Sequence, residues 1–443
     1  MKVIEIFSSK INFKKSVLNK INRNMASNTL WLFFDKIFRM GVGFLVYTWI
    51  ARYLGPTSFG KLTYAQAFVS LFSAIATLGL DGIVIRNLVR YPNKKDEIIG
   101  TTFILRLLSA LFMVMLVFAT IKVVNPQDSL LHALVLITAL GTIFQAFSPI
   151  DFWYESQMKT KFFIIPKNFA FTLIAIVNVC FIIFQANLMI FAITALVEII
   201  LGSIFTISIY KRHNNKLLDW KPSVLMAKEL LKDSWPLIIS GMAVVLYMRI
   251  DQVMIKAMLG EKELGYYSAS SRLAELWYFI PTVIVSSTFP LIVKLKSTNE
   301  FMYYKRLQNL YNILTWVAII IGIVVMFLSE IIVNLLFGEG YNKSASVLSI
   351  SIWASVFVFQ GVARGNWIRT ENLQHYTYWY TLSGCAVNIV LNLFFIKYYG
   401  IAGAAFATLI SQCTVAIIAP AIFKKTRLSS KMIIKSFFWG KHS

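Results

Sequence analysis

The chain has 443 residues, of which 58% are hydrophobic and 14% are charged, and it carries a formal net charge of +23. Soluble domains are about 45–50% apolar and about 25% charged, so this composition excludes an ordinary soluble protein. Apolar runs of about 20 residues recur from end to end, which is the pattern of a polytopic helical membrane protein.

Twelve apolar segments are long enough to cross a membrane as helices. They cover residues 28–51, 58–80, 97–121, 130–150, 165–185, 188–209, 234–257, 264–289, 307–330, 344–363, 376–396 and 400–423. We therefore predict an all-α polytopic membrane protein. Its predicted parts are a cytoplasmic basic amphipathic segment (1–27), an N-lobe of six spans (28–210), a cytoplasmic linker (211–233), a C-lobe of six spans (234–423) and a cytoplasmic basic tail (424–443).

The distribution of Lys and Arg predicts the orientation of these spans. With both termini in the cytoplasm, a large majority of the 43 Lys and Arg residues fall in cytoplasmic segments and few fall in outer loops. Short cytoplasmic loops are enriched in these residues. We therefore predict a multi-pass membrane protein with both termini cytoplasmic, and the positive charge needs no nucleic acid partner.

The two ends of the chain combine lysines with apolar residues at helical spacing. These apolar residues are Ile4, Phe7, Ile11, Leu18 and Ile21 at the start, and Met432, Ile433, Phe437 and Trp439 at the end. One interpretation is a pair of amphipathic helices that lie on an anionic inner leaflet. The other is a pair of disordered basic tails, and the sequence favours neither.

Two glycines of the first half recur in the second half. YLGPTSFG and MLGEKELG have glycines at the same positions, so that Gly55 and Gly60 correspond to Gly260 and Gly265 at an offset of 205 residues. Each pair brackets a corner between two spans on the outer side. We expect all four glycines to serve these tight turns.

A second set of matching residues relates the later spans of the two halves. Trp153 corresponds to Trp367, and Asn178 corresponds to Asn392, at an offset of 214 residues. Each half therefore consists of six spans with the same order of features, and an even number gives both halves the same orientation. We predict two six-helix bundles related by a pseudo-two-fold axis along the membrane normal, with a cavity between them.

Charged residues within the predicted spans are the strongest pointer to function. Away from the ends of the spans, they are Asp35, Lys36, Arg39, Arg106, Glu198, Arg249, Asp251, Arg272 and Glu275. A charge at the centre of a bilayer costs about 2.5–3.5 kcal/mol on insertion scales, so such residues face water or a partner rather than lipid.

Helical spacing tells which of these charges can pair on their own helix. Asp35 and Arg39 are four residues apart, and Arg272 and Glu275 are three apart, so each pair shares a face. Arg106 has no charged neighbour within a turn.

The five cations of this set, which are Lys36, Arg39, Arg106, Arg249 and Arg272, outnumber its four acids. We interpret the cations as the lining of a large, water-filled, positive cavity whose guanidinium and ammonium groups bind phosphate oxygens. The alternative is that these residues form structural salt bridges between helices.

Ion coupling requires an acid that can bind a proton or Na⁺, and Asp35, Glu198 and Asp251 are the candidates. Glu198 stands alone in an apolar run, so it is protonated, paired with a base on another helix, or facing water. We expect no cofactor and no metal site, since the cysteines and histidines have no ligand or catalytic spacing. No phosphate-binding glycine loop is present, so ATP hydrolysis is not expected.

Three segments resemble a known family. ARYLGPTSFGKLTYAQAFVSLFSAIATLGLDG from Ala51, DFWYESQMK from Asp151 and KYYGIAGAAFATLISQ from Lys397 are similar to the bacterial O-antigen and polysaccharide-unit flippases. These belong to the multidrug/oligosaccharidyl-lipid/polysaccharide exporter superfamily. Many relatives carry Gln-Gly after the fourth span, whereas this chain has Tyr154-Glu155-Ser156-Gln157.

The resemblance implies a V-shaped pair of bundles around a central cationic cavity. It also implies a non-enzymatic function, namely alternating-access transfer of an undecaprenyl-diphosphate-linked oligosaccharide from the cytoplasmic to the periplasmic leaflet. The family's cavity cations map onto Lys36, Arg39, Arg249 and Arg272. Expected partners are the lipid-linked substrate, membrane lipids, a polysaccharide polymerase and chain-length machinery.

Aromatic residues near the predicted cavity are candidates for stacking on sugars, although such residues are also common membrane-interface anchors. They are Tyr247, Tyr266, Tyr267, Trp277 and Tyr278.

Three other functions compete with this prediction. A multidrug exporter of the same superfamily takes mainly cationic substrates, for which an acid-dominated pocket is expected. A membrane polysaccharide polymerase or acyltransferase needs a polar catalytic centre, typically in a long outer loop, and the predicted outer loops are short. A static scaffold leaves the charges within the spans unexplained.

Overall fold

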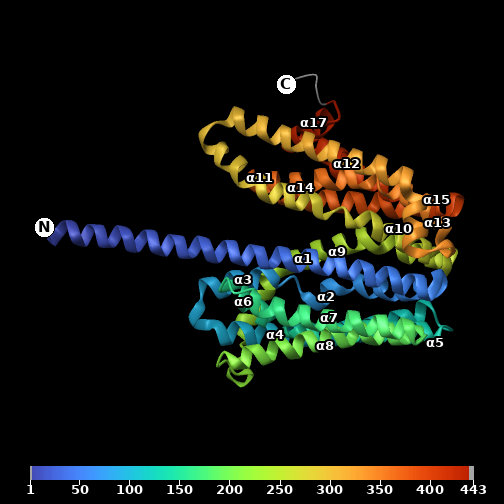
Figure 1. Ribbon diagram of the computed structural model, residues 1–443, viewed down its shortest axis with the longest axis horizontal. Coiled ribbons are helices and arrows are strands. Elements are labelled where there is room, and N and C mark those ends of the chain that lie inside the picture. Colours follow the sequence, from blue (N-terminus) through green and yellow to red (C-terminus); the bar gives the residue numbers. More distant parts are fainter. Residues whose placement is uncertain (1, 439–443) are drawn as a thin grey trace. The chain divides into compact units, whose positions relative to one another are not determined.

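The computed structural model describes the backbone of residues 2–438 and the side chains of residues 27–438, and this part of the chain contains helices and no strand (Figure 1). The chain forms two compact units. The first consists of the chain up to Tyr47 together with Ile75–Ile238, and the second consists of Thr48–Ala74 together with the chain from Ile239 onward.

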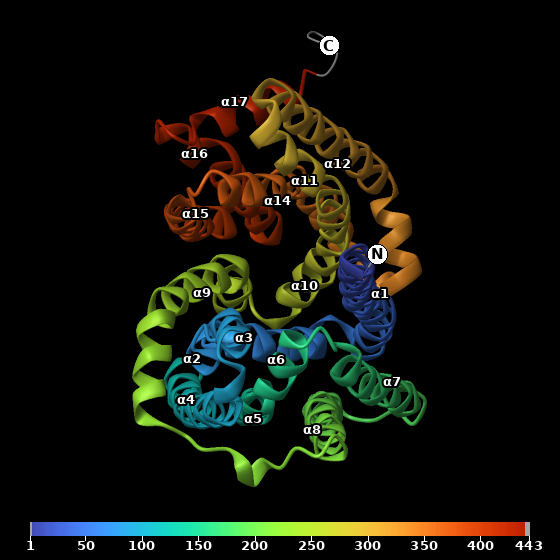
Figure 2. The ribbon, with the colours of Figure 1, turned by 90° about the vertical axis from the view of Figure 1, so that its left-hand side faces the viewer.

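The first unit is a bundle of long helices joined by short helical turns. Its elements are part of α1 (Lys2–Leu71), part of α2 (Ser73–Thr77), α3 (Asp81–Arg90), η1 (Pro92–Lys94), α4 (Lys95–Val124), α5 (Ser129–Phe144), η2 (Gln145–Phe147), α6 (Pro149–Ser156), α7 (Lys161–Ile183), α8 (Leu188–Arg212), η3 (Leu217–Asp219) and the start of α9 (Val224–Leu259). Helix α8 packs along α7 on one side and α5 on the other, and α5 also packs on α4 (Figure 2).

The second unit is built around α12. Its elements after α9 are α10 (Glu261–Leu276), α11 (Phe279–Thr298), α12 (Glu300–Phe337), η4 (Glu339–Tyr341), α13 (Asn342–Ser351), α14 (Ala354–Thr370), α15 (His375–Cys413), the π-helix η5 (Thr414–Ile418), α16 (Ala419–Ile422) and α17 (Arg427–Ser436). Helix α12 contacts α11, α13, α14 and α17, and the core lies between these helices (Figure 1).

Membrane-spanning helices dominate both units. Among the described residues, eight helices are long and apolar enough to cross a membrane, and two bent helix pairs raise this number to as many as ten. The pairs bend by 48° between α1 and α3 and by 46° between η4–α13 and α14. The prediction of a polytopic all-helical membrane protein is therefore confirmed.

Large apolar side chains also cover the outside of these helices. Phe112, Met115, Phe169 and Ile331 are each more than half exposed. A soluble protein would bury such residues, whereas a lipid bilayer solvates them. The helices are therefore apolar on most faces, because one face packs in the unit and another faces hydrocarbon.

The repeated glycines have two different structural roles. Gly55 and Gly260 have positive φ angles of 69° and 91°, which confirms the predicted turns. Gly60 and Gly265 instead allow the segment after Gly55 to cross α10 closely. A Cβ on Gly60 would overlap the carbonyl oxygen of Glu261, and a Cβ on Gly265 would overlap that of Pro56. The expectation that all four glycines serve only turns is therefore wrong for Gly60 and Gly265.

The C-terminal helix α17 packs on its own unit. Met432 and Ile433 are 7% and 0% exposed within the core cluster, and the Gln308 side-chain amide donates to the carbonyl oxygen of Met432 at 2.9 Å. The interpretation of these two residues as a leaflet-facing surface is therefore wrong, because they complete the core. Trp439 and the side chains of the predicted N-terminal amphipathic face lie outside the described residues.

Candidate functional site

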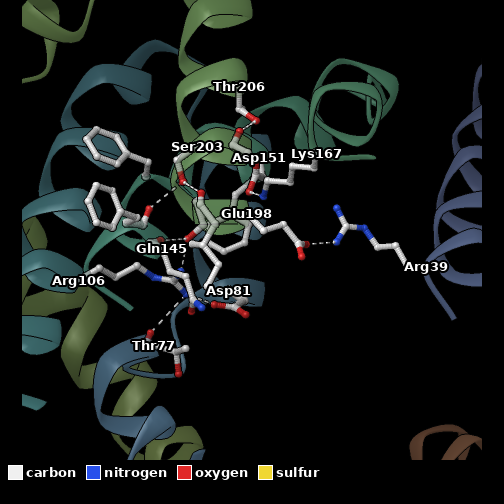
Figure 3. A pocket seen from close by; sticks show the side chains of 16 residues that line it. Arg39, Thr77, Asp81, Arg106, Gln145, Asp151, Lys167, Glu198, Ser203 and Thr206 are labelled. Carbon is white, nitrogen blue, oxygen red and sulfur yellow. Dashed lines mark hydrogen bonds and ion pairs between the residues drawn. The ribbon is translucent and has the colours of Figure 1, made fainter. Parts of the chain in front are cut away.

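A charged cavity of about 370 Å³ lies within the first unit (Figure 3). It is bounded by α1, α4, α6, α7, α8, the α2–α3 segment and η2. The charged residues that line it are Arg39, Asp81, Arg106, Asp151, Lys167 and Glu198. This cavity therefore brings together three cations and three acids from helices that are far apart in sequence.

Arg39 reaches toward the cavity from α1 and contacts acids on two helices (Figure 3). Its Nε lies 3.1 Å from Asp35 Oδ1 one turn earlier, and its Nη1 lies 3.4 Å from Glu198 Oε1 on α8. Its guanidinium also lies 5.1 Å from the centre of the Phe171 ring. The predicted pairing of Asp35 with Arg39 is confirmed, and Glu198 pairs with a base on another helix.

Arg106 is the most buried cation of this cavity, with 5% of its surface exposed. Its guanidinium donates to Asp81 and to the hydroxyl of Ser148, and it lies 4.9 Å from the centre of the Phe152 ring. A buried guanidinium requires such partners, since the loss of its hydration costs several kcal/mol. Arg106 therefore links α3, α4 and the turn before α6.

Asp151 and Lys167 form the third ion pair of the cavity. Asp151, on α6, is 7% exposed. Burial raises the pKa of its carboxyl, while Lys167 and then Arg106 act in the opposite direction. The pKa of the neighbouring Glu155 is also raised, first by burial and then by the negative charges of Asp151 and Asp81. Helix α6 therefore concentrates acids beside the cavity.

In the second unit, two predicted cations share one acid. Arg249 Nη1 lies 3.3 Å from Glu275 Oε1, and Arg272 Nη1 lies 3.8 Å from Glu275 Oε2. This confirms that Arg272 and Glu275 can pair on their own helix, and it adds Arg249 from α9 to the same carboxylate. Glu275 is therefore shared by guanidinium groups from two helices.

Asp251 lies on α9 in a buried polar network of the second unit, and 6% of its surface is exposed. Its carboxylate accepts hydrogen bonds from the Tyr267 hydroxyl and, at 2.7 Å, from the backbone N–H of Gln252. The Tyr267 hydroxyl lies 3.4 Å from Thr408 Oγ1, to which the Asn388 amide donates at 3.5 Å. The network therefore gathers carboxylate, hydroxyl and amide oxygens from four segments.

The remaining predicted residues have different surroundings. Lys36 is exposed on α1. Tyr266 and Tyr267 are 7% and 2% exposed in the core of the second unit, so they present little surface to a sugar. Their proposed stacking role is therefore wrong in this structure, because their rings pack inside the unit.

Comparison with known proteins places the chain in a family. The sequence profile of the family described as polysaccharide biosynthesis protein matches residues 25–296, which is more than half of the chain. The chain belongs to the polysaccharide biosynthesis protein family. The MatE profile matches residues 236–394 of this family member.

Two curated relatives extend over most of this polysaccharide biosynthesis family member. The capsular polysaccharide biosynthesis protein CapF from Staphylococcus aureus is 22% identical over 411 residues, which cover 90% of this chain and 99% of the relative. The probable low-salt glycan biosynthesis flippase Agl15 from Haloferax volcanii is 22% identical over 394 residues, which cover 88% and 81% of the two chains.

Two solved structures share the fold of this family member. The lipid II flippase MurJ in an inward closed conformation superposes with a TM-score of 0.72 and 16% identity, covering 93% of this chain and 91% of that one. An inward-facing multidrug resistance MATE family transporter gives a TM-score of 0.70 and 13% identity, covering 91% and 96%. The chain therefore has a fold like that of MATE transporters and MurJ.

The sequence missed half of the charged residues around the first-unit cavity. Asp81, Asp151 and Lys167 lie at the ends of predicted spans, where charges are common and give no signal. They are also too far from Arg106 along the chain for the i, i+3 and i, i+4 rule, which pairs side chains on one helix. Only the tertiary arrangement places them around one hollow.

Proposed function

We propose that this chain is a flippase, which moves an undecaprenyl-diphosphate-linked oligosaccharide from the cytoplasmic to the outer leaflet of the inner membrane. The observation that carries the proposal is the family match over residues 25–296. The two relatives that align over most of the chain are named for capsular polysaccharide biosynthesis and for a probable glycan flippase. The proposed activity is transport by alternating access without catalysis, in a protein with both termini in the cytoplasm.

We further propose that the chain crosses the membrane twelve times as two six-span repeats. Helices α1 and α15 each contain one non-helical glycine, Gly55 and Gly400, and a break at each would turn the ten candidate spans into twelve. The Gly60–Gly265 crossing supports the repeat, because position 56 lies over Gly265 just as position 261 lies over Gly60. A pseudo-two-fold axis along the membrane normal relates the proposed repeats.

The predicted cations Lys36, Arg39, Arg106, Arg249 and Arg272 are proposed to bind the diphosphate. Arg39, Arg249 and Arg272 each contact an acid in the structure. A diphosphate would therefore exchange with these carboxylates rather than fill an empty site. Such an exchange keeps the guanidinium groups paired at every stage, which limits the desolvation cost of transport.

The same exchange gives the acids a role in ion coupling. When a diphosphate binds Arg39, Glu198 and Asp35 lose part of their contact with a cation and gain affinity for a proton or Na⁺. Asp251 is the third candidate, because its carboxylate lies among hydroxyl and amide oxygens that suit a hard cation. No cofactor beyond a coupling ion is proposed.

Complementation of a flippase-deficient strain tests this function. Wild type is expected to restore surface polysaccharide and to clear lipid-linked units from the inner leaflet. The Arg39→Ala, Arg249→Ala double variant is expected to strand those units inside. Arg369→Ala, which removes an exposed arginine of the second unit, is the matched control. Normal surface polysaccharide with the double variant would contradict the cation mechanism.

Multidrug export is the second candidate function, and the MatE match over residues 236–394 is the observation that favours it. It predicts that expression of the chain protects a drug-sensitive strain against lipophilic cations. The flippase proposal predicts no such protection and restored surface polysaccharide. A polysaccharide polymerase and chain-length machinery are proposed partners of the flippase.

A further inference from the structure

A second hollow of the first unit, of about 500 Å³, lies at the predicted cytoplasmic ends of its helices. It is lined by the start of the described side chains of α1, by the α6–α7 connection and by the end of α8. The described residues that line it include Lys159 and Lys161 but no Asp or Glu. This hollow therefore differs from the first cavity, whose three cations are matched by three acids.

The connection that carries the two lysines is held in a defined conformation. Met158 has a positive φ of 54°, and the backbone N–H of Lys159 donates to the carbonyl oxygen of Tyr154 at 2.9 Å. The backbone N–H of Thr160 donates to the Asn28 side chain on α1 at 3.1 Å. These contacts fix the backbone beside the hollow, while both lysine side chains stay exposed.

Aromatic residues from α1, α6 and α7 also line the hollow. Trp153 and Tyr154 have ring centres 4.8 Å apart, and Tyr154 and Phe162 have ring centres 5.5 Å apart. The Tyr154 hydroxyl lies 2.9 Å from His213 Nδ1, so the end of α8 is tied to α6. Trp31 of α1 adds a further ring to the lining. Tyr154 is buried, so Trp31 offers the flat apolar surface that suits the face of a sugar.

Polar groups complete the lining between the rings. The side chains of Asn28 and Gln157 line the hollow. Thr160 also lines it, but this residue is only 1% exposed, so the two amides are the polar side chains that a ligand can reach.

We propose that this hollow, called the loading pocket below, binds the glycosylated diphosphate headgroup of the lipid-linked substrate at the cytoplasmic face before translocation. The inference rests on the proposed flippase function. Lys159 and Lys161 supply positive charge for the diphosphate, Trp31 supplies a stacking surface for the first sugar, and the amides bind hydroxyl groups. Lysines and tryptophans are also common interface anchors, but those face lipid headgroups rather than line a hollow of about 500 Å³.

Equilibrium binding to the full chain in phosphatidylcholine nanodiscs tests the loading pocket. The probes are farnesyl-diphosphate-linked N-acetylglucosamine and farnesyl diphosphate without the sugar. The Lys159→Gln, Lys161→Gln variant is expected to bind both probes about 30-fold more weakly, since each lysine near a membrane surface contributes about fivefold. Trp31→Ala is expected to weaken only the sugar-bearing probe, by about fivefold.

Lys262→Gln, at an exposed lysine of the second unit, is the control and is expected to bind both probes as wild type does. Unchanged affinity in the double lysine variant would overturn the loading pocket, as would failure of wild type to bind either probe. Equal competition by phosphatidylglycerol would also overturn it and would identify a phospholipid-headgroup site instead.

Transport in cells separates this inference from the proposed function. The double lysine variant is expected to need a higher level of lipid-linked substrate for half-maximal surface polysaccharide, with an unchanged maximum. A wild-type chain that restores surface polysaccharide, together with a variant that matches it at every substrate level, would overturn the loading pocket alone. A wild-type chain that restores none would overturn the proposed function.

Discussion

At the scale of single residues, Arg364 of α14 donates hydrogen bonds to backbone carbonyl groups of a neighbouring helix that contains a proline. Pro420 has no N–H, so in the five-residue register of the π-helix η5 the carbonyl oxygen of Val415 lacks its helical donor. Arg364 Nη1 donates to that oxygen at 2.5 Å and to the oxygen of Ala416 at 2.9 Å. Arg364 is only 4% exposed, so its charge is stabilised by these carbonyl dipoles and by the Tyr380 ring at 5.1 Å.

Arg364→Met is expected to destabilise the protein by about 2 kcal/mol, because two buried carbonyl groups lose their donor. In a Pro420→Ala background the same change is expected to cost about 1 kcal/mol less, since residue 420 then supplies an N–H to Val415. Thermal unfolding in detergent measures all four combinations. Equal losses of stability in both backgrounds would contradict this role of Arg364. Arg369→Met, at an exposed arginine, is the control.

The acids on α6 give the first unit a pH-dependent stability. Burial, Asp151 and Asp81 raise the pKa of Glu155 above its ordinary value of 4.5. A carboxyl whose pKa is raised on folding binds more protons in the folded state, so its contribution falls as the pH rises through the raised pKa. Glu155→Gln is therefore expected to raise the unfolding temperature at pH 7–8 and to change it little near pH 4. Melting curves from pH 4 to pH 8 check this, and a larger gain at pH 4 would contradict it.

At the scale of elements, the close crossing after Gly55 depends on two glycines. Ser268 Oγ donates to Thr63 Oγ1 at 3.1 Å one turn beyond the crossing, which keeps the two helices in register. A methyl group on Gly60 or Gly265 would overlap a backbone carbonyl oxygen of the other helix, and backbone cannot move aside as a side chain can.

Gly60→Ala and Gly265→Ala are each expected to destabilise the second unit by about 3 kcal/mol or more, or to abolish folding. Gly361→Ala on α14 is the matched control, since nothing lies within 4 Å of its added Cβ. Its expected effect is neutral or stabilising by up to about 1 kcal/mol, because alanine favours a helix. Folded yield and melting temperature measure the series, and tolerance of both alanines at the crossing would refute the close packing.

Two adjacent residues of helix α17 allow a similar test of close packing. Ile433 is 0% exposed in the core of the second unit, whereas Ile434 is 46% exposed. Ile433→Asp is expected to destabilise the unit by several kcal/mol, and Ile434→Asp by less than about 1 kcal/mol. Thermal unfolding of the two variants decides between core packing and a membrane-surface helix, for which the two losses would be similar.

Elements were more predictable from the sequence than their contacts. Helical spacing predicted that Asp35 meets Arg39, because both lie on one face of α1. It could not predict that Glu275 joins Arg249 or that Asp81 joins Arg106, since those pairs depend on tertiary packing. Pattern matching found the glycine repeat, but it could not tell a turn glycine from one at a helix crossing.

At the scale of the whole molecule, matched residues in the two halves support one repeated design. Thr194 Oγ1 donates to Asn178 Oδ1 at 2.7 Å in the first unit. Positions 214 residues later hold Thr408 and Asn392, whose neighbour Asn388 donates to Thr408 at 3.5 Å in the second unit. Similar polar pairs therefore join corresponding helices in each half. The second half adds Asp251 to its network, which makes this half the better candidate for ion binding.

We propose that embedded arginines carry a lipid-linked diphosphate glycan across the membrane. Reconstituted proteoliposomes with a fluorescent undecaprenyl-diphosphate-linked oligosaccharide in the inner leaflet measure this directly, through the label that becomes accessible to an external quencher. We predict rapid transfer by wild type and by Arg369→Ala, and at least a tenfold slower transfer by Arg39→Ala, Arg249→Ala. Equal transfer rates for the double variant and wild type, or no transfer by wild type, would contradict the account.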